Sequence, residues 1–202
     1  GHVRVYSWNG SSWVQKGMDI DGEVAGDYFG KSVSLSSDGN TFIAGAIYND
    51  GNGNSSGHVR VYSWNGSSWV QKGLDIDGDA ANDSFGHSVS LSSEGNTFIA
   101  GARYNDGNGN SFGHVRVYSW NGSSWVQKGL DIGGGAGGHY FGASVSLSSD
   151  GNTFIAGFKN NSENGLSSGH VRVYSWNGSS WVQKGLDVDG GAGGHYFGAS
   201  VS

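Results

Sequence analysis

The sequence predicts an all-β protein, a β-propeller built from four-stranded antiparallel blades. The octapeptide Gly-His-Val-Arg-Val-Tyr-Ser-Trp begins at Gly1, Gly57, Gly113 and Gly169, so the chain is a tandem array with a period of 56 residues. Each repeat contains short β-forming runs separated by Gly- and Asn-rich turns. No stretch long enough for a helix has helical periodicity.

The array forms one domain over residues 1–202. Its repeats span 1–56, 57–112 and 113–168, and a partial fourth copy spans 169–202. Because units of this kind bury their faces only by stacking on neighbours, we expect the chain to be a fragment of a longer array.

The first half of each repeat predicts an antiparallel hairpin. Val3–Trp8 is rich in β-forming residues, and 13–16 supplies the returning strand. Between them, Asn9-Gly10 is typical of a two-residue type I′ turn. Trp8 and Trp13 flank this turn, where we expect a cross-strand aromatic pair rather than a sugar-binding surface.

The second half predicts another hairpin, with strands at 32–36 and 41–46 around the turn Asp38-Gly39-Asn40. Alternation with a period of two places Val33 and Leu35 on one face and the serines on the other. Each repeat is therefore expected to contribute four strands.

Both faces of such a sheet carry bulky side chains, with Val3 and Val5 on one side and Tyr6 and Trp8 on the other. A single sheet cannot bury both faces, whereas sheets stacked face to face can. The small residues at 44–46 would allow neighbouring sheets to approach closely. Four-stranded units stacked radially form a β-propeller.

Composition excludes several classes of function. The net charge is −6, and the eleven Lys and Arg residues are dispersed, so no basic stripe is present to bind nucleic acid. No apolar run approaches the roughly 20 residues of a membrane span. The absence of Cys excludes disulfides and thiolate chemistry.

Particular dipeptides resemble a known family. Phe29-Gly30 followed by Gly45-Ala46 is similar to the FG-GAP repeat of integrin α-chain β-propellers and of related surface proteins, although Ile47 stands where the family has Pro. The resemblance implies that the Phe-Gly strand is the innermost of its blade, with blades at about 29–76, 85–132 and 141–188. It also implies an extracellular or cell-surface location.

Calcium is the cofactor that the resemblance implies, because integrin-type blades carry an Asp-rich loop. Alternating carboxylates suit a hard cation. The candidate ligands in the first two copies are Asp19, Asp21, Glu23, Asp27, Asp75, Asp77, Asp79 and Asp83. The third and fourth copies lose carboxylates here, so solvated turn residues are the alternative interpretation.

Four Asn-Gly-Ser sequences fit the acceptor pattern for N-glycosylation, at Asn9, Asn65, Asn121 and Asn177. The alternative is that Asn-Gly is present for its turn geometry. The histidines recur at fixed repeat positions, and we expect them to be surface or turn residues.

Three functions remain. The first is a non-enzymatic recognition or adhesion module whose variable loops bind a protein or glycan, which includes a lectin-like propeller. The second is a structural subunit of an extracellular filament, coat or appendage that binds further copies of itself. The third is an enzyme, for which no pair of distinct carboxylates stands out.

Overall fold

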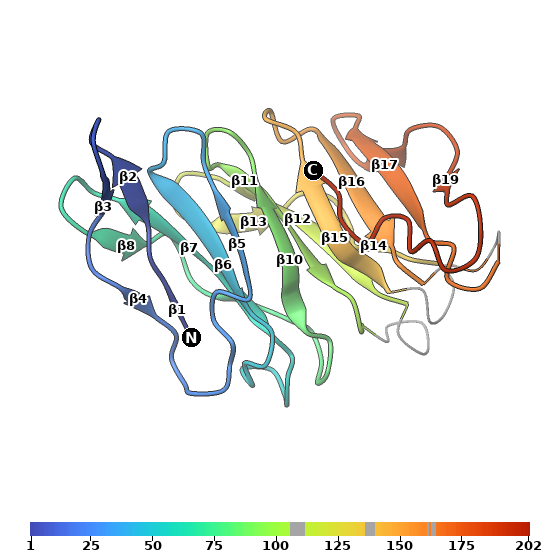
Figure 1. Ribbon diagram of the computed structural model, residues 1–202, viewed down its shortest axis with the longest axis horizontal. Helices are drawn as coiled ribbons and strands as arrows, with labels where there is room; N and C mark the ends of the chain where they lie inside the picture. Colours follow the sequence, from blue (N-terminus) through green and yellow to red (C-terminus); the bar gives the residue numbers. More distant parts are fainter. Residues whose placement is uncertain (106–111, 136–139, 161, 163–164) are drawn as a thin grey trace.

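The computed structural model describes residues 1–105, 112–135, 140–160, 162 and 165–202. These residues form strands, turns and loops (Figure 1). Among the described residues, no helix is long and apolar enough to cross a membrane. The all-β prediction is confirmed.

Three blades share one plan: a four-stranded meander with a short fifth strand. The first blade consists of β5 (Ser32–Leu35), β6 (Thr41–Ala46), β7 (His58–Trp64), β8 (Trp69–Gln71) and β9 (Ile76–Asp77). The second consists of β10 (Phe85–Leu91), β11 (Thr97–Ala102), β12 (His114–Trp120), β13 (Trp125–Gln127) and β14 (Ile132–Gly133). The third consists of β15 (Phe141–Leu147), β16 (Thr153–Phe158), β17 (His170–Trp176), β18 (Trp181–Gln183) and β19 (Val188–Asp189).

The first 21 residues form part of a preceding blade, in two small sheets. Its strands are β1 (His2–Val3), β2 (Tyr6–Trp8), β3 (Trp13–Gln15) and β4 (Ile20–Asp21). The sequence predicts one continuous strand over 3–8, but here it is split. In the complete blades this strand pairs along its length with a Thr-Phe-Ile-Ala strand, which the first segment lacks.

The short fifth strand was not predicted. In the second blade, β13 pairs with one end of β12 through Trp120 and Trp125, and β14 pairs with the other end through His114 and Gly133. Two residues carry too little periodicity to identify a strand from sequence. The fifth strand nevertheless brings the Asp-rich loop beside the buried histidine of the same blade.

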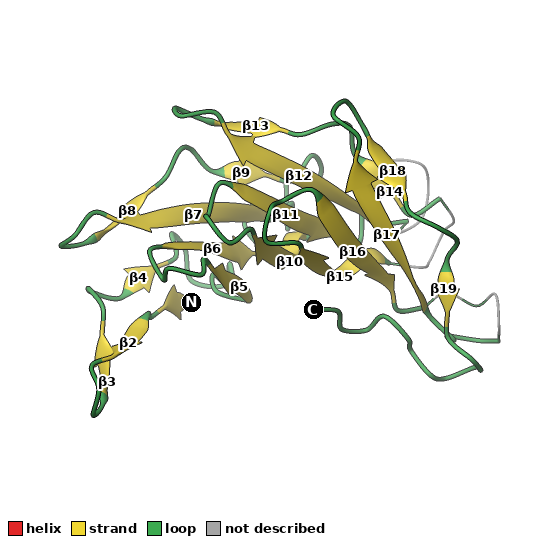
Figure 2. Ribbon diagram, turned by 90° about the horizontal axis from the view of Figure 1, so that it is seen from above, coloured by secondary structure: helices red, strands yellow, loops and turns green. Residues whose placement is uncertain are grey.

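The blades fan around an arc (Figure 2). The Phe-Gly strands β10 and β15 lie on its inner side with β5, and β8, β13 and β18 lie on its outer side. β10 packs against both β5 and β15. The propeller architecture and the inner position of the Phe-Gly strand are therefore as predicted.

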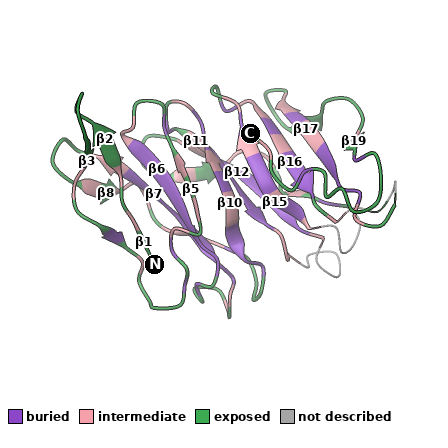
Figure 3. Ribbon diagram, in the orientation of Figure 1, coloured by how far each residue is buried: buried purple, intermediate pink, exposed green. Residues whose placement is uncertain are grey.

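Apolar side chains fill the space between successive blades. Much of β6, β7, β11 and β12 is accordingly buried (Figure 3). Ile43, Val59 and Val61 on one face of the first blade pack against Phe85 and Phe98 of the second. The same packing joins the second blade to the third. Fully burying a large apolar side chain contributes about 1.5–3 kcal/mol, so these contacts are the main source of stability.

The two glycines of the repeat motif meet between blades. A Cβ at Gly45 would lie 2.1 Å from the carbonyl oxygen of Gly86, so only glycine permits this approach. Gly86 itself has a φ of 82°, a conformation that favours glycine. The Ser32 hydroxyl donates to the same carbonyl at 2.6 Å. The motif therefore joins the inner strands of neighbouring blades.

A lysine and two tryptophans join neighbouring repeats on the outer side. The indole of Trp69 donates to the carbonyl of Lys16 at 2.7 Å, and the Lys16 ammonium lies over the rings of Trp64 and Trp69. The same ammonium donates to Gly39 O at 2.7 Å. Lys72 and Lys128 repeat these contacts. The predicted structural role of the tryptophans agrees with this arrangement.

The outer hairpin turn differs from its prediction. Trp8 and Trp13 pair directly, so the loop has four residues rather than two. Oδ1 of Asn9 accepts hydrogen bonds from the N–H groups of Ser11 and Ser12, both at 2.9 Å. This Asx-type cap replaces the type I′ turn, because the asparagine side chain competes effectively for nearby backbone donors.

Candidate functional site

The loops at one end of the blades carry most of the differences between repeats. Because β6, β7 and β9 pair at Ala46, His58 and Asp77, the loops that follow and precede them leave the same end of the sheet. We call this end the variable face, defined as 22–31, 47–57, 78–84, 190–196 and the described residues of 103–113, 134–140 and 159–169. The variable positions 23–28, 79–84, 103 and 159–166 lie on it, except 161 and 163–164, which lie outside the described residues.

Tyrosines lie on the variable face, where Tyr28, Tyr48 and Tyr196 are exposed and Tyr104 and Tyr140 are half-buried. Tyr28 and Tyr48 make an edge contact with ring centroids 5.1 Å apart, and Tyr104 makes a similar contact with Tyr140. Tyr28, Tyr140 and Tyr196 have φ between 49° and 60°, which is uncommon for a residue with a side chain. Strained backbone of this kind persists where surrounding structure fixes it, and it is concentrated at functional sites.

The predicted calcium ligands of the first copy lie in different environments. Asp19 binds the guanidinium of Arg4 at 2.6 Å, and Asp27 is buried and accepts from the Asn49 amide at 3.1 Å. Glu23 pairs with Arg60 of the next repeat. Asp21 is exposed and lies opposite His2 in the β1–β4 ladder.

The second copy divides its carboxylates in the same way. Asp75 binds Arg60 at 2.6 Å, and Asp79 pairs with Arg116 of the next repeat. Asp77 lies 4.0 Å from Nδ1 of His58. Asp83 is buried and accepts hydrogen bonds from the Asn105 amide and from the Ala80 N–H.

Arginine takes the position between carboxylates in both junctions. Arg60 bridges Glu23 and Asp75, and Arg116 bridges Asp79 and Asp131. Two clusters within the described residues place three ligand atoms close enough to hold a metal ion, and each contains one of these carboxylate pairs with a histidine: Glu23, His58, Asp75 and Asp79, His114, Asp131. A calcium ion would have to displace the guanidinium. Calcium therefore stays a prediction.

The electrostatics of the first cluster follow from burial and contact. Burial opposes ionisation of Asp75, but hydrogen bonds from Arg60 and Gln71 outweigh it and lower its pKa. Burial lowers the pKa of His58, assisted by the charge of Arg60 and opposed by Asp75. The cluster therefore consists of the neutral imidazole of His58 beside the ion pair of Arg60 and Asp75.

Three of the periodic histidines are not surface residues as predicted. His58, His114 and His170 are 2%, 4% and 1% exposed, and each begins the third strand of its blade. In each complete blade the histidine pairs with the last residue of the second strand, as His58 does with Ala46. His2 is exposed, and the first segment has no such strand.

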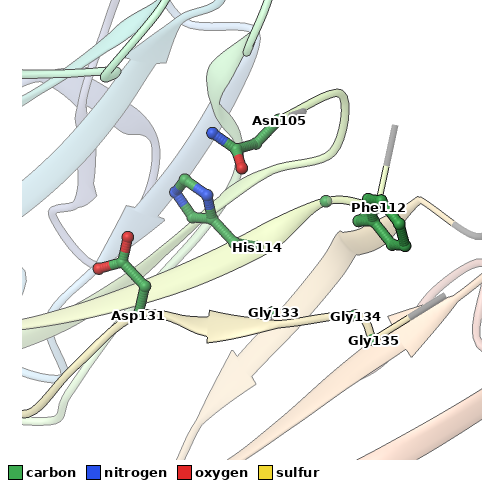
Figure 4. Close-up of a pocket in the computed structure, with 8 residues that line it drawn as sticks. Asn105, Phe112, His114, Asp131, Gly133, Gly134 and Gly135 are labelled. Carbon is green, nitrogen blue, oxygen red and sulfur yellow. The ribbon is translucent and has the colours of Figure 1, made fainter. Parts of the chain in front are cut away.

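A polar cavity of about 450 Å³ lies beside His114 in the second blade. Its described lining includes Asn105, Phe112, His114, Asp131 and the glycines 133–135. The imidazole lies between the carboxamide of Asn105 and the carboxylate of Asp131 (Figure 4). Burial lowers the pKa of His114, although Asp131 and Asp83 oppose this, so the imidazole is neutral near pH 7.

The predicted glycosylation sites lie at the tips of the outer hairpins, on exposed four-residue loops. Each carboxamide oxygen caps its loop, as described for Asn9. Glycan attachment at Asn9, Asn65, Asn121 and Asn177 stays a prediction, and the exposure of the loops permits it.

The stacked four-stranded sheets define a β-propeller-like repeat protein. Residues 15–62 and 70–118 match the family model of the FG-GAP repeat. These segments are FG-GAP repeats, which confirms the resemblance based on Phe29-Gly30 and Gly45-Ala46. No curated protein sequence matches the chain.

Solved structures support the same fold. The chain is similar to a candidate 6-phosphogluconolactonase from Bacteroides uniformis, with a TM-score of 0.61 and 13% identity over 96% of this chain and 53% of the other. A second candidate 6-phosphogluconolactonase, from Bacteroides fragilis, gives a TM-score of 0.51 and 12% identity over 78% of this chain and 38% of the other. The chain thus spans about half the length of the first. At these identities the likeness shows the fold alone.

Sequence reasoning missed the histidine cavity. Its signal was present in the differences between repeats. Phe112 stands where the neighbouring repeats have Ser56 and Ser168, and Gly133 stands where they have Asp77 and Asp189. These two substitutions are 21 positions apart in the sequence, and only the pairing of β12 with β14 brings them to the same cavity.

Proposed function

We propose that this chain is a non-enzymatic recognition module, displayed outside the cell or on its surface, that binds a protein or glycan ligand through the variable face. The observation that carries the proposal is the separation of constant from variable residues. The outer hairpins are nearly identical in all four copies, and the differences gather on one face.

The chemistry of the variable face supports binding. Tyrosine combines a large apolar ring with a polar hydroxyl at low cost in conformational entropy, and it is enriched at recognition surfaces. Tyr28, Tyr48 and Tyr196 are 44–58% exposed. The repeated inner and outer contacts between blades fix the strands that carry the loops, and a preorganised scaffold reduces the entropy lost on binding.

Contacts with arginine argue against catalysis by three of the carboxylates. Asp75, Asp131 and Asp187 are each bound by an arginine of their own blade. Arginine contacts lower the pKa of Asp75 and Asp187, whereas a general acid near pH 7 needs a raised one.

Binding of labelled protein to arrays of extracellular proteins and glycans tests the proposal. Replacing Tyr28, Tyr140 and Tyr196 by Ser, the residue at the equivalent Ser84, should weaken binding roughly tenfold, the loss of about 1.4 kcal/mol. The matched control replaces Ser11, Ser67 and Ser123 by Ala on the outer hairpins and should bind normally. Equal loss in both variants would contradict a role for the variable face.

A second candidate, a structural subunit that assembles with further copies, is favoured by a different observation. One large apolar side chain per repeat lies 86–89% exposed in the loop after the outer hairpin, at Met18, Leu74, Leu130 and Leu186. Exposed apolar side chains that recur once per 56-residue repeat are suited to contact another array with the same repeat. Electron microscopy would show fibres, and replacing these four residues by Ser should dissolve them.

A further inference from the structure

We propose that the cavity beside His114 binds one neutral pyranose ring of a carbohydrate. This inference rests on the proposed recognition function and assigns it a site and a ligand class. The cavity lies on the variable face and is bounded by residues of the second and third repeats.

The first support is an unsatisfied buried group. Among the described residues, Nε2 of His114 has no hydrogen-bond partner, although the side chain is only 4% exposed. A buried polar atom without a partner costs about 1–3 kcal/mol. A ligand hydroxyl in the cavity would satisfy it, because a neutral imidazole accepts at one nitrogen and donates at the other.

The second support is the comparison with the other repeats. Nδ1 of His58 lies 4.0 Å from Asp77, and Nδ1 of His170 lies 3.9 Å from Asp189. The residue paired with His114 is instead Gly133. A Cβ at Gly133 would meet no described atom within 4 Å, so the space that a carboxylate fills elsewhere is open here.

The third support is the rest of the lining. Phe112 provides an apolar surface for the C–H face of a sugar ring, where the other repeats have serine. Asp131 is held by Arg116 and Gln127 through three hydrogen bonds. Since a carboxylate has about four acceptor positions, it can accept a further hydroxyl.

Charge selects the ligand class. The Asp131 carboxylate disfavours an anion, and Arg116 beside it disfavours a metal ion or an organic cation. A neutral polyol uses both the polar and the aromatic parts of the lining. The volume of about 450 Å³ lies within the roughly 300–1,000 Å³ of small-molecule sites.

The repeats supply the variants for a test. Gly133→Asp and Phe112→Ser install residues that the equivalent positions of neighbouring repeats already hold, so both should fold. Gly191→Asp is the matched control, because it adds the same charge at an exposed glycine whose Cβ would also meet no described atom within 4 Å.

The experiment follows the imidazole nitrogen resonances of His114 by NMR in the full chain. The probes are the methyl pyranosides and the free reducing sugars of glucose, galactose, mannose and N-acetylglucosamine. We expect at least one probe to shift the Nε2 resonance, with affinity lowered roughly tenfold or more by Gly133→Asp and Phe112→Ser and unchanged by Gly191→Asp. Binding of the methyl pyranoside indicates a glycan residue, and binding of the reducing sugar alone indicates a free monosaccharide.

The proposal is overturned if no probe shifts the resonance, or if Gly133→Asp binds as well as the unmodified chain. Array binding that persists while His114 does not respond would leave the recognition function standing without this site. A His114 response without any array binding would support the site and contradict the recognition function.

Discussion

At the scale of single residues, one repeat position can serve different purposes in different copies. Position 31 of the first repeat is Lys31, and the later repeats have His87, Ala143 and Ala199 there. Burial, together with the charges of Arg103 and Lys31, lowers the pKa of His87 to about 4. The Lys159 charge acts in the same direction, and a hydrogen bond to the backbone of Ala143 opposes it.

His87 should make stability depend on pH. Its folded pKa of about 4 is below the ordinary value of 6.5, so the unfolded chain binds a proton that the folded chain does not. The stability is fully present above pH 6.5 and is lost as the pH falls towards 4. In the variant His87→Ala, the fall in the free energy of unfolding between neutral pH and pH 4 should be smaller by on the order of 2 kcal/mol, a figure reduced for solvent screening.

Urea unfolding midpoints at several pH values between neutral and acidic check this expectation. Because Ala143 occupies the equivalent position of the next blade, the variant should fold normally. An unchanged pH profile in His87→Ala would show that other groups cause the acid sensitivity.

At the scale of elements, the repeated sequence predicted the strands well and their ends poorly. The strand 41–46 agrees with β6, because its apolar residues face two neighbouring blades and its turns are marked by glycine. The inner strand extends to Phe85–Leu91 in the second blade through a bulge between Phe85 and Ser88, which no local pattern indicates. The outer turn is shaped by hydrogen bonds to the Asn9 side chain, which the Asn-Gly dipeptide alone does not predict.

The candidate site was less predictable than the fold for a physical reason. Sequence spacing grouped Asp75, Asp77 and Asp79 as ligands of one ion. In an extended chain, alternate residues lie roughly 6–7 Å apart, so their carboxylates need not converge on one ion. Residues on other strands determine which partner each carboxylate contacts. Arg60 binds Asp75 within one blade, whereas Asp79 is bound by Arg116 of the next repeat, so the second contact depends on blade stacking.

The outer clamp between repeats provides an element-scale prediction. Trp125→Phe keeps the aromatic contact with Phe98 but removes the 2.7 Å hydrogen bond to Lys72 O. The free energy of unfolding should fall by about 1 kcal/mol, as for other partly buried hydrogen bonds.

Trp13→Phe is the control for this change, because Trp13 is 67% exposed. Urea denaturation should show little effect for Trp13→Phe and a lower midpoint for Trp125→Phe. Equal effects would show that the tryptophans stabilise each hairpin from within rather than the junction between repeats.

At the scale of the whole molecule, arginine side chains form ion pairs between blades, Arg60 with Glu23 and Arg116 with Asp79. The third junction departs from this plan, since Gly135 replaces the carboxylate and Arg172 instead contacts the carbonyl of Gly134 at 3.3 Å. The blades still stack there, so the apolar contacts suffice and the ion pairs add to them.

Chelation should therefore leave the thermal stability of the chain unchanged. Glu23 and Asp79, two of the predicted calcium ligands, are already paired with Arg60 and Arg116. Differential scanning calorimetry with EDTA and with calcium chloride measures this directly. A melting temperature that rises with calcium concentration would instead support the calcium prediction, because a ligand that binds only the folded state stabilises it.

The contacts between repeats also bear on how such a chain can change its length. The serine-to-carbonyl bonds join residues 54 positions apart at each junction, and the indole-to-carbonyl bonds join residues 53 apart. Inserting or deleting one whole unit therefore recreates every junction with its partners in place. Gain or loss of whole units would therefore yield foldable products, and substitutions on the loops of each new unit would diversify the variable face without disturbing the contacts between blades.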